Sequence, residues 1–156
     1  MAVLDTDATA VFEAYVLAQG IPVSYGGGRA FYSPQADAIT LPLVETFKGS
    51  DEFHATAFHE AAHSTGHSSR LNRPGVVDFD HFGSHNYSRE ELIAELGSAL
   101  VMGALGLDKP NLIENQAAYL KSWKSALKDD PQAIVWAAGR AEKAANLILG
   151  IEEVAA

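Results

Sequence analysis

Apolar positions recur along this chain with two different periods, and the change of period marks where helices and strands are expected. Residues 6–19 carry apolar side chains at the three- and four-residue spacing of an amphipathic helix, and Gly20 is placed to end it. This helix is expected to cover a sheet. The side chains expected on its buried face are Val11, Ala14, Tyr15 and Leu17 or Ala18.

Three short apolar runs bounded by turn residues follow and predict three β-strands. They cover residues 21–25, 29–33 and 38–43. The glycines at 26–28 indicate a hairpin turn between the first two strands, because a phosphate-binding loop would continue through Lys and Ser or Thr into a helix. Pro42 suits an edge strand or the end of a strand.

The rest of the chain returns to helical spacing. Helices are expected from residue 50 to the glycine at 66, and over 88–107, 111–127 and 131–149. The loop that follows Gly66 has about twenty residues without a period, and a loop of that length in a compact domain is usually functional, so we expect it to form one wall of a cleft. The order predicts an α+β fold with a small N-terminal sheet. The apolar stripe of the 88–107 helix and the tryptophans expected to pack the last two helices are Leu92, Ile93, Leu96, Leu100, Val101, Trp123 and Trp136.

Composition narrows the classes of function. The chain has 156 residues and no cysteine, which excludes a disulfide framework and a thiolate metal site. Its 20 acidic and 11 basic residues give a net charge of −9, which argues against direct binding of a nucleic-acid backbone. The first twenty residues lack the basic start of a signal peptide, and no apolar run is long enough to span a bilayer. We therefore expect one cytoplasmic domain over residues 1–156.

The helix that begins near residue 50 contains the clearest chemical motif. His59, Glu60 and His63 read H-E-x-x-H, and two histidines four residues apart lie on the same face of a helix, where both can bind one metal ion. Glu60 points elsewhere and can reach a metal-bound water as a general base. The helix has recognisable ends, with Ser50 expected as N-cap and Gly66 expected to end it. This context favours a zinc hydrolase over a chance match.

A hydrolytic zinc site needs a third protein ligand. A histidine three residues after Gly66 would make this a metzincin, but that position is Ser69. Glu91 and Glu95 share one face of the next helix, and we expect Glu91 to bind the metal and Glu95 to orient a ligand histidine, with Glu95 as the rival ligand. Ser88 and Glu91 also have the spacing of a capping box, which would occupy Glu91 in capping instead.

Other residues near the motif are weaker candidates. Tyr87 precedes the Glu91 helix and is a candidate catalytic residue that donates a hydrogen bond to an oxyanion. The remaining candidate ligands, most of them expected to lie on the surface or in loops, are His54, His67, His81, His85 and Glu90.

Several blocks of sequence resemble a known family in the same order. They are FYSPQADAITLP, ATAFHEAAHSTGHSSRLNR, YSREELIAELGSAL and NQAAYLKSWKSALKDDPQAIVWAAGRAEKAA. Together they resemble the zincin-like metallopeptidase domain of ArdC-type antirestriction proteins, which also occurs in plasmid primases and phage polyvalent proteins. The similarity spans residues 12–149.

The resemblance implies a gluzincin-like fold, one Zn²⁺ at His59 and His63, Glu60 as general base, and a third ligand from the block of residues 90–95. Members of the ArdC type also carry a preceding domain that binds single-stranded DNA, which we expect this chain to lack. Ala61, Ala62 and Ser64 depart from the bulkier, more polar or aromatic residues common in the family. These departures leave the ligands intact and place the substrate preference in question.

The leading hypothesis is therefore a zinc peptidase that acts on a protein or peptide, with host restriction machinery as a candidate partner. A second hypothesis is a catalytically silent binding module that engages a restriction enzyme or another host protein. A third is an accessory nucleic-acid contact through Arg70 and Arg73 in the long loop.

Overall fold

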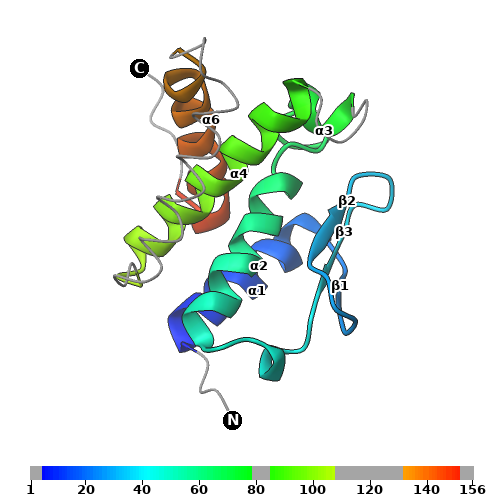
Figure 1. The fold of residues 1–156 in the computed structure, drawn as a ribbon, viewed down its shortest axis with the longest axis vertical. Helices are drawn as coiled ribbons and strands as arrows, with labels where there is room; N and C mark the ends of the chain where they lie inside the picture. Colours follow the sequence, from blue (N-terminus) through cyan, green and yellow to red (C-terminus); the bar gives the residue numbers. More distant parts are fainter. Residues whose placement is uncertain (1–4, 79–84, 108–131, 152–156) are drawn as a thin grey trace.

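The computed structural model describes residues 5–78, 85–107 and 132–151, without the side chains of residues 85–87. Figure 1 shows how the elements are arranged. They are α1 (Thr6–Gln19), β1 (Val23–Tyr25), β2 (Phe31–Ser33), β3 (Ala38–Leu41), the 3₁₀ helix η1 (Val44–Thr46), α2 (Ser50–Ser64), α3 (Pro74–Val77), α4 (His85–Ala104) and α6 (Gln132–Leu149). The expected helix over 111–127, with Trp123, lies outside the described residues.

Helix α1 has the predicted bounds but a different buried face. The side chain of Asp5 caps its first turn by accepting the Ala8 N–H at 2.9 Å, and Gly20 ends it with a φ of 68°. Its buried residues are Ala8, Phe12, Tyr15 and Val16. The prediction was wrong for Ala14, Leu17 and Ala18, which are exposed. The helix packs on α2 and α6, and the large Phe12 ring, edge-on to Phe58, selects the buried face.

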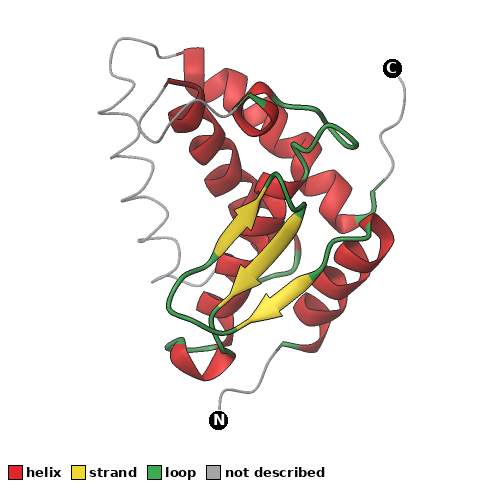
Figure 2. Ribbon diagram, turned by 90° about the vertical axis from the view of Figure 1, so that its right-hand side faces the viewer, coloured by secondary structure: helices red, strands yellow, loops and turns green. Residues whose placement is uncertain are grey.

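The three strands form one sheet in the order β1-β3-β2, which Figure 2 shows face on. Strand β1 runs parallel to β3, and β2 runs antiparallel to β3. The predicted hairpin at glycines 26–28 is therefore wrong, because β3 lies between the strands that these glycines connect. The hairpin instead joins β2 to β3, and Asp37 in its turn has a φ of 49°. Since β3 is central, Pro42 marks the end of a strand, and β2 is a free edge.

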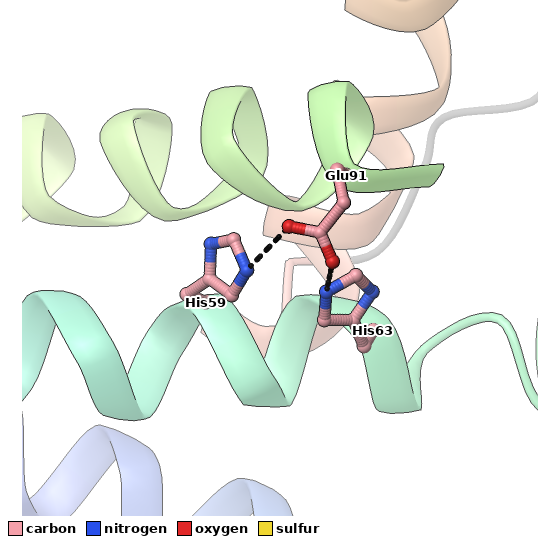
Figure 3. Close-up of side chains that lie close together, drawn as sticks. All are labelled: His59, His63 and Glu91. Carbon is pink, nitrogen blue, oxygen red and sulfur yellow. Dashed lines mark ion pairs between the residues drawn. The ribbon is translucent and has the colours of Figure 1, made fainter. Parts of the chain in front are cut away.

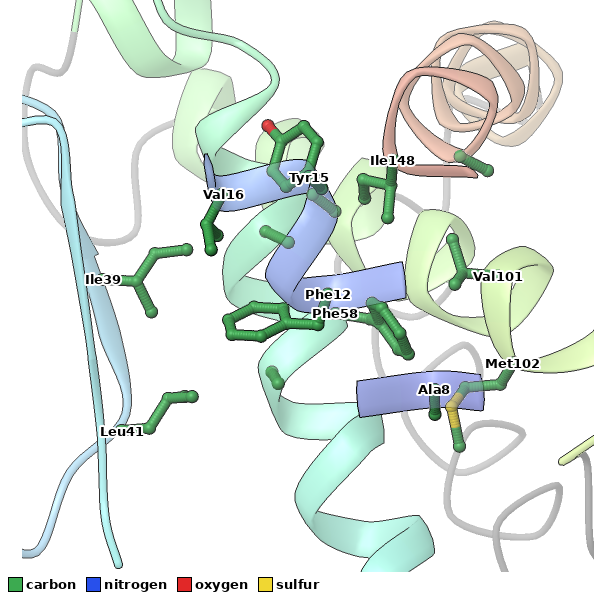
Figure 4. Close-up of a cluster of buried hydrophobic side chains, with 14 of the residues drawn as sticks. Ala8, Phe12, Tyr15, Val16, Ile39, Leu41, Phe58, Val101, Met102 and Ile148 are labelled. Atoms are coloured by element: carbon green, nitrogen blue, oxygen red, sulfur yellow. The ribbon is translucent and has the colours of Figure 1, made fainter. Parts of the chain in front are cut away.

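Helix α2 lies between the sheet and α4 (Figure 1). Its alanines at 57, 61 and 62 are fully buried, which lets neighbouring elements approach closely. In Figure 4, Ile39 and Leu41 point from β3 toward the aromatic pair of Phe12 and Phe58. The core thus joins the sheet, α1 and α2 into one packed unit around the helix that carries the candidate ligands.

The ends of α2 differ from the sequence prediction. Gly49 occupies the N-cap position, and Ser50 is the first helical residue. The Ser50 hydroxyl instead accepts the backbone N–H of Asp5 at 2.9 Å, so it ties α2 to the start of α1. The helix ends at Ser64, with Thr65 in the right-handed helical conformation at the C-cap.

Helix α4 begins at His85, three residues before the predicted start at Ser88. It ends ahead of Gly106, whose φ is 72°, and α6 ends ahead of Gly150 in the same way. Leu92, Ile93 and Val101 are buried as predicted, but Leu100 is 46% exposed. Trp136 of α6 is partly buried and lies under the Arg140 guanidinium, 4.0 Å from the ring centroid. Among the helices that the structure describes, none combines the length and apolar character of a membrane span.

Candidate metal centre

The two histidines of α2 lie one helical turn apart and face α4. The ring centroids of His59 and His63 are 4.8 Å apart, with the planes inclined by 80°. The Nε2 atoms of both rings approach the carboxylate of Glu91, which α4 presents from the opposite side (Figure 3). The spacing of residues on α2 therefore converges on one carboxylate of α4.

Glu91 contacts both histidines. Its Oε2 lies 3.3 Å from Nε2 of His59, and its Oε1 lies 2.9 Å from Nε2 of His63. One donor atom from each of the three residues lies within 4.8 Å of the others. Two imidazole nitrogens and a carboxylate oxygen at this separation are the donor set of a divalent-cation site that keeps a further position open. The capping-box alternative is wrong, because Ser88 lies inside α4 and does not cap it.

The other ring nitrogen of each histidine is also held by a carboxylate. Nδ1 of His59 lies 3.1 Å from Glu95, and Nδ1 of His63 lies 2.8 Å from Glu90. An ionised carboxylate only accepts hydrogen bonds, so in both pairs Nδ1 carries the hydrogen. In the neutral imidazole this leaves the lone pair on Nε2, facing Glu91. Glu95 thus takes the orienting position that the sequence suggested, and Glu90 takes a matching position that the sequence analysis did not assign.

Arg73 holds Glu90 in place from the segment after α2. Its Nε donates to Glu90 Oε1 at 2.8 Å and its Nη2 to Oε2 at 3.0 Å, a two-point contact between buried groups. The remaining donors bind Ala62 O and Thr65 Oγ1, both at 2.7 Å. A buried arginine with all these partners shows that the start of the long loop is built against the histidine helix. The position of Arg73 between the motif and the glutamates was the signal available in the sequence.

The charges of the cluster support one another. Burial alone would lower the pKa of His59, but hydrogen bonds to Glu91 and Glu95 outweigh it and raise the pKa to about 9. The same balance, with Glu90 and Glu91 as partners, raises the pKa of His63 well above its usual value. Burial alone would raise the pKa values of Glu90 and Glu91, and their hydrogen bonds to the histidines lower both. The site therefore favours positive charge between its carboxylates.

Glu60 is buried beside these residues with an unpaired oxygen. Its side chain is 6% exposed, and Oε2 has no hydrogen-bond partner among the residues that the structure describes. Burial raises the pKa of this carboxyl above its ordinary value. A buried carboxylate oxygen without a partner is a marker of function, because folding alone gains nothing from it.

A cleft of about 890 Å³ opens over this centre. One wall is the edge strand β2 with its flanking residues, and the other is formed by the start of the long loop and α3. The prediction that the long loop lines a cleft is confirmed for its described part. Lining residues from the three sides include Phe31, Tyr32, Glu60, His63, His67, Val76 and Glu91.

The remaining predicted residues are placed as follows. His54 is buried away from the centre, where Nε2 contacts Thr9 Oγ1 at 3.0 Å and Nδ1 contacts Ser50 O at 2.9 Å. His67 lines the cleft and bonds Ser69. His81 lies outside the described residues, as do the side chains of His85 and Tyr87. Tyr87 as an oxyanion donor stays a prediction.

Comparison with known proteins agrees with this arrangement. Residues 7–140 match the model of a family described as zincin-like metallopeptidase. A DNA primase TraC from Escherichia coli is 43% identical over 143 residues, which cover 90% of this chain and 10% of the primase. The crystal structure of the Mn(II)-bound antirestriction protein ArdC from plasmid R388 superposes with a TM-score of 0.73 at 37% identity, covering 96% of this chain and 53% of ArdC. The metal-free ArdC structure gives a TM-score of 0.70 at 39% identity, covering 94% and 50%.

The chain spans about a tenth of the primase and about half of ArdC. What these comparisons share with this protein is thus the region of the small sheet, the histidine helix and the helices that follow. The fold is α+β and zincin-like, as predicted, and the similar ArdC protein comes from a plasmid. With most of its length matching the family model, the chain belongs to the zincin-like metallopeptidase family.

Proposed function

We propose that this protein is a metal-dependent peptidase domain of an antirestriction-type protein, with one divalent cation held by His59, His63 and Glu91. The observation that carries the proposal is the convergence of both Nε2 atoms on Glu91 while both Nδ1 atoms are held by carboxylates. Carboxylate partners on ligand histidines fix the ring orientation and raise the basicity of the ligand nitrogen. A purely structural ion-pair cluster would not need both histidines to present the same ring nitrogen to one carboxylate.

The donor set fits a catalytic ion. Two histidines and one glutamate are the ligands of a peptidase zinc site, and affinity for such a site is higher for Zn²⁺ than for Mn²⁺ in the usual order of divalent metals. The related ArdC structure was solved with Mn(II). We propose zinc for this chain on the ligand types, and a binding competition between the two ions tests that choice.

When bound, the ion would supply Lewis acidity, which lowers the pKa of a bound water and polarises a carbonyl. Glu60 is the group of this chain placed to move the proton. Glu60 lines the cleft together with His63, so its carboxylate lies close enough to the proposed metal to accept a proton from the attacking water. The same carboxyl then donates that proton to the departing amine of the cleaved peptide bond. Burial raises the pKa of Glu60, which favours the protonated form that donates to the departing amine.

The edge strand β2 offers the means to bind an extended peptide. One side of β2 pairs with β3, and Phe31, Tyr32 and Ser33 of β2 line the cleft together with Glu60, His63 and Glu91. A peptide laid along this edge would gain main-chain hydrogen bonds, so recognition would depend on an extended shape more than on one side chain. We propose a protein or peptide substrate, with host restriction machinery as the candidate partner and no direct nucleic-acid contact by this chain.

The proposal is tested by replacing Glu60 with Gln. Peptide hydrolysis, followed by mass spectrometry on a peptide library with metal-loaded protein, should fall to background because the amide cannot accept the proton. Metal content should stay at the wild-type value. Glu13→Gln, an exposed change on α1, is the matched control and should leave both unchanged.

Hydrolysis that survives in the Glu60→Gln protein contradicts the mechanism. A cellular antirestriction effect that is indifferent to Glu60→Gln, together with no hydrolysis by the wild type, would favour the binding module instead.

A further inference from the structure

We infer that Arg73 is a positioning residue for the metal centre, acting on His63 through Glu90. The inference rests on the proposed metal site and adds residues from outside the two ligand-bearing faces. It makes the segment after α2 part of the device that sets metal affinity, in addition to being a wall of the cleft.

Arg73 is connected to His63 through the buried carboxylate of Glu90. Arg73 is 5% exposed and Glu90 is 3% exposed, so water competes little for their charges. Oε2 of Glu90 is shared, because it accepts from Nη2 of Arg73 at 3.0 Å and from Nδ1 of His63 at 2.8 Å. Oε1 accepts from Nε of Arg73 at 2.8 Å. Arg73 therefore fixes the plane of the carboxylate, and that carboxylate fixes the His63 ring.

The backbone around Arg73 folds back onto the end of α2. The backbone N–H of Arg73 donates to Gly66 O at 2.9 Å, which closes the segment back onto the end of α2. A Cβ on Gly66 would lie 2.9 Å from Cζ and Nη2 of Arg73, so glycine is needed for the guanidinium to sit there. Asn72, just before Arg73, has a φ of 51°, the left-handed conformation that asparagine adopts more readily than most residues with a side chain. The segment accepts these constraints at the place where Arg73 is buried.

Without Arg73, the carboxylate of Glu90 would no longer be held in place. A buried carboxylate that keeps a single partner loses much of the compensation for its desolvation. Without the guanidinium, the carboxylate would turn toward water, and this change removes the fixed acceptor for His63 Nδ1–H. With that acceptor gone, the His63 ring is free to rotate and its Nε2 no longer faces Glu91. Loss of such an orienting partner lowers metal affinity by about 10- to 100-fold.

Arg70 provides a matched control within the same segment. Its guanidinium also makes a two-point contact with a carboxylate, at 2.9 Å and 2.8 Å from the two oxygens of Asp37. Its side chain is 2% exposed. Asp37 belongs to the β2–β3 hairpin and touches none of the proposed ligands. Arg70→Gln thus removes a buried arginine that makes the same kind of two-point contact, but with a carboxylate that does not hold a proposed ligand.

The experiment measures the Zn²⁺ dissociation constant by competition with a chromogenic chelator. Arg73→Gln and Glu90→Gln should each weaken Zn²⁺ binding by about 10- to 100-fold. Because both residues act along one path, the double variant should bind no more weakly than the single variant with the larger loss. Arg70→Gln should stay within about twofold of wild type. Arg73→Lys, which keeps the charge but not the planar fork, should fall between wild type and Arg73→Gln and serves if the latter does not fold. Wild-type affinity in Arg73→Gln or Arg73→Lys, or equal losses in Arg70→Gln and Arg73→Gln, overturns the inference.

A second readout does not depend on metal. In metal-free ¹⁵N-labelled protein, the ring Nδ1–H of His63 should give a slowly exchanging downfield resonance in wild type and in Arg70→Gln. That resonance should vanish in Arg73→Gln. If it persists there, the inference fails. If the wild type binds no metal while this pattern holds, the proposed function fails, but Arg73 still positions the His63 ring through Glu90.

Discussion

Gly66→Ala separates two roles for the glycine that follows the histidine helix. The sequence suggested that Gly66 ends the helix, a role that requires a left-handed backbone. In the structure Gly66 is not among the residues with positive φ. A Cβ there would instead lie 2.6 Å from Val76 Cγ2 and 2.9 Å from the Arg73 guanidinium. The glycine is therefore required for close contact.

The size of the effect follows from these contacts. Val76 and Arg73 are each 5% exposed, so neither side chain has solvent to move into. Overpacking of this kind costs about 1–3 kcal/mol, and the lower entropy of the unfolded alanine chain returns roughly 0.4–1 kcal/mol. Gly66→Ala should therefore lower the free energy of unfolding by up to about 2.6 kcal/mol.

Urea unfolding followed by circular dichroism measures this change, with an unaltered m-value as the sign that only stability has changed. Gly103→Ala is the control, because a Cβ at Gly103 in α4 meets nothing within 4 Å and should stabilise the protein. Gly66→Asn sharpens the test, since asparagine tolerates the left-handed conformation but adds bulk. A neutral or stabilising Gly66→Ala, or a Gly66→Asn that is milder than Gly66→Ala, refutes the close-contact role.

Three further outcomes follow from the same structure. Glu95→Gln should weaken Zn²⁺ binding about tenfold in a chelator competition, because the His59 ring loses its charged acceptor. The stability of the metal-free protein, measured by thermal unfolding, should change little. Removing metal with a chelator should lower the melting temperature of wild type but not of His63→Ala. At a free metal concentration of 100 times Kd, bound metal raises the free energy of unfolding by about 2.7 kcal/mol. Equal melting temperatures of the wild type with and without metal would contradict metal binding. Burial raises the pKa of Tyr15 from 10.0 to about 12, so this tyrosine contributes stability below pH 10 that is lost as the pH rises toward 12. The contribution is up to about 2.7 kcal/mol, and Tyr15→Phe should abolish that part of the alkaline loss in urea unfolding.

Sequence alone predicted the parts of the fold that depend on local patterns. Helix α1, the start of the central strand β3 at Ala38 and the glycine ends of the last helices follow from periodicity and from the conformational freedom of glycine. Strand order did not follow, because three runs of similar length and composition are compatible with several pairings. The glycines at 26–28 suggested the nearest pairing, and the parallel contact of β1 with β3 overrode it.

The candidate centre shows the same division. The spacing of His59 and His63 placed two imidazoles on one face, and the spacing of Glu91 and Glu95 placed two carboxylates on another. Neither spacing says how the two faces are aligned with each other. Packing of α2 against α4 decides it, with Glu91 facing both Nε2 atoms and Glu95 one Nδ1. The pairing of Arg73 with Glu90 was missed, because two charged residues separated by a loop share no period.

The metal content of purified protein measures directly whether His59, His63 and Glu91 bind a metal ion. Purified wild-type protein, Glu91→Ala and Glu95→Ala would be equilibrated with Zn²⁺, dialysed and measured by inductively coupled plasma mass spectrometry. We expect about one equivalent of metal in wild type, a reduced but measurable amount in Glu95→Ala, and none in Glu91→Ala. Wild type without bound metal, or Glu91→Ala with a full equivalent, would show that His59, His63 and Glu91 do not form the metal site.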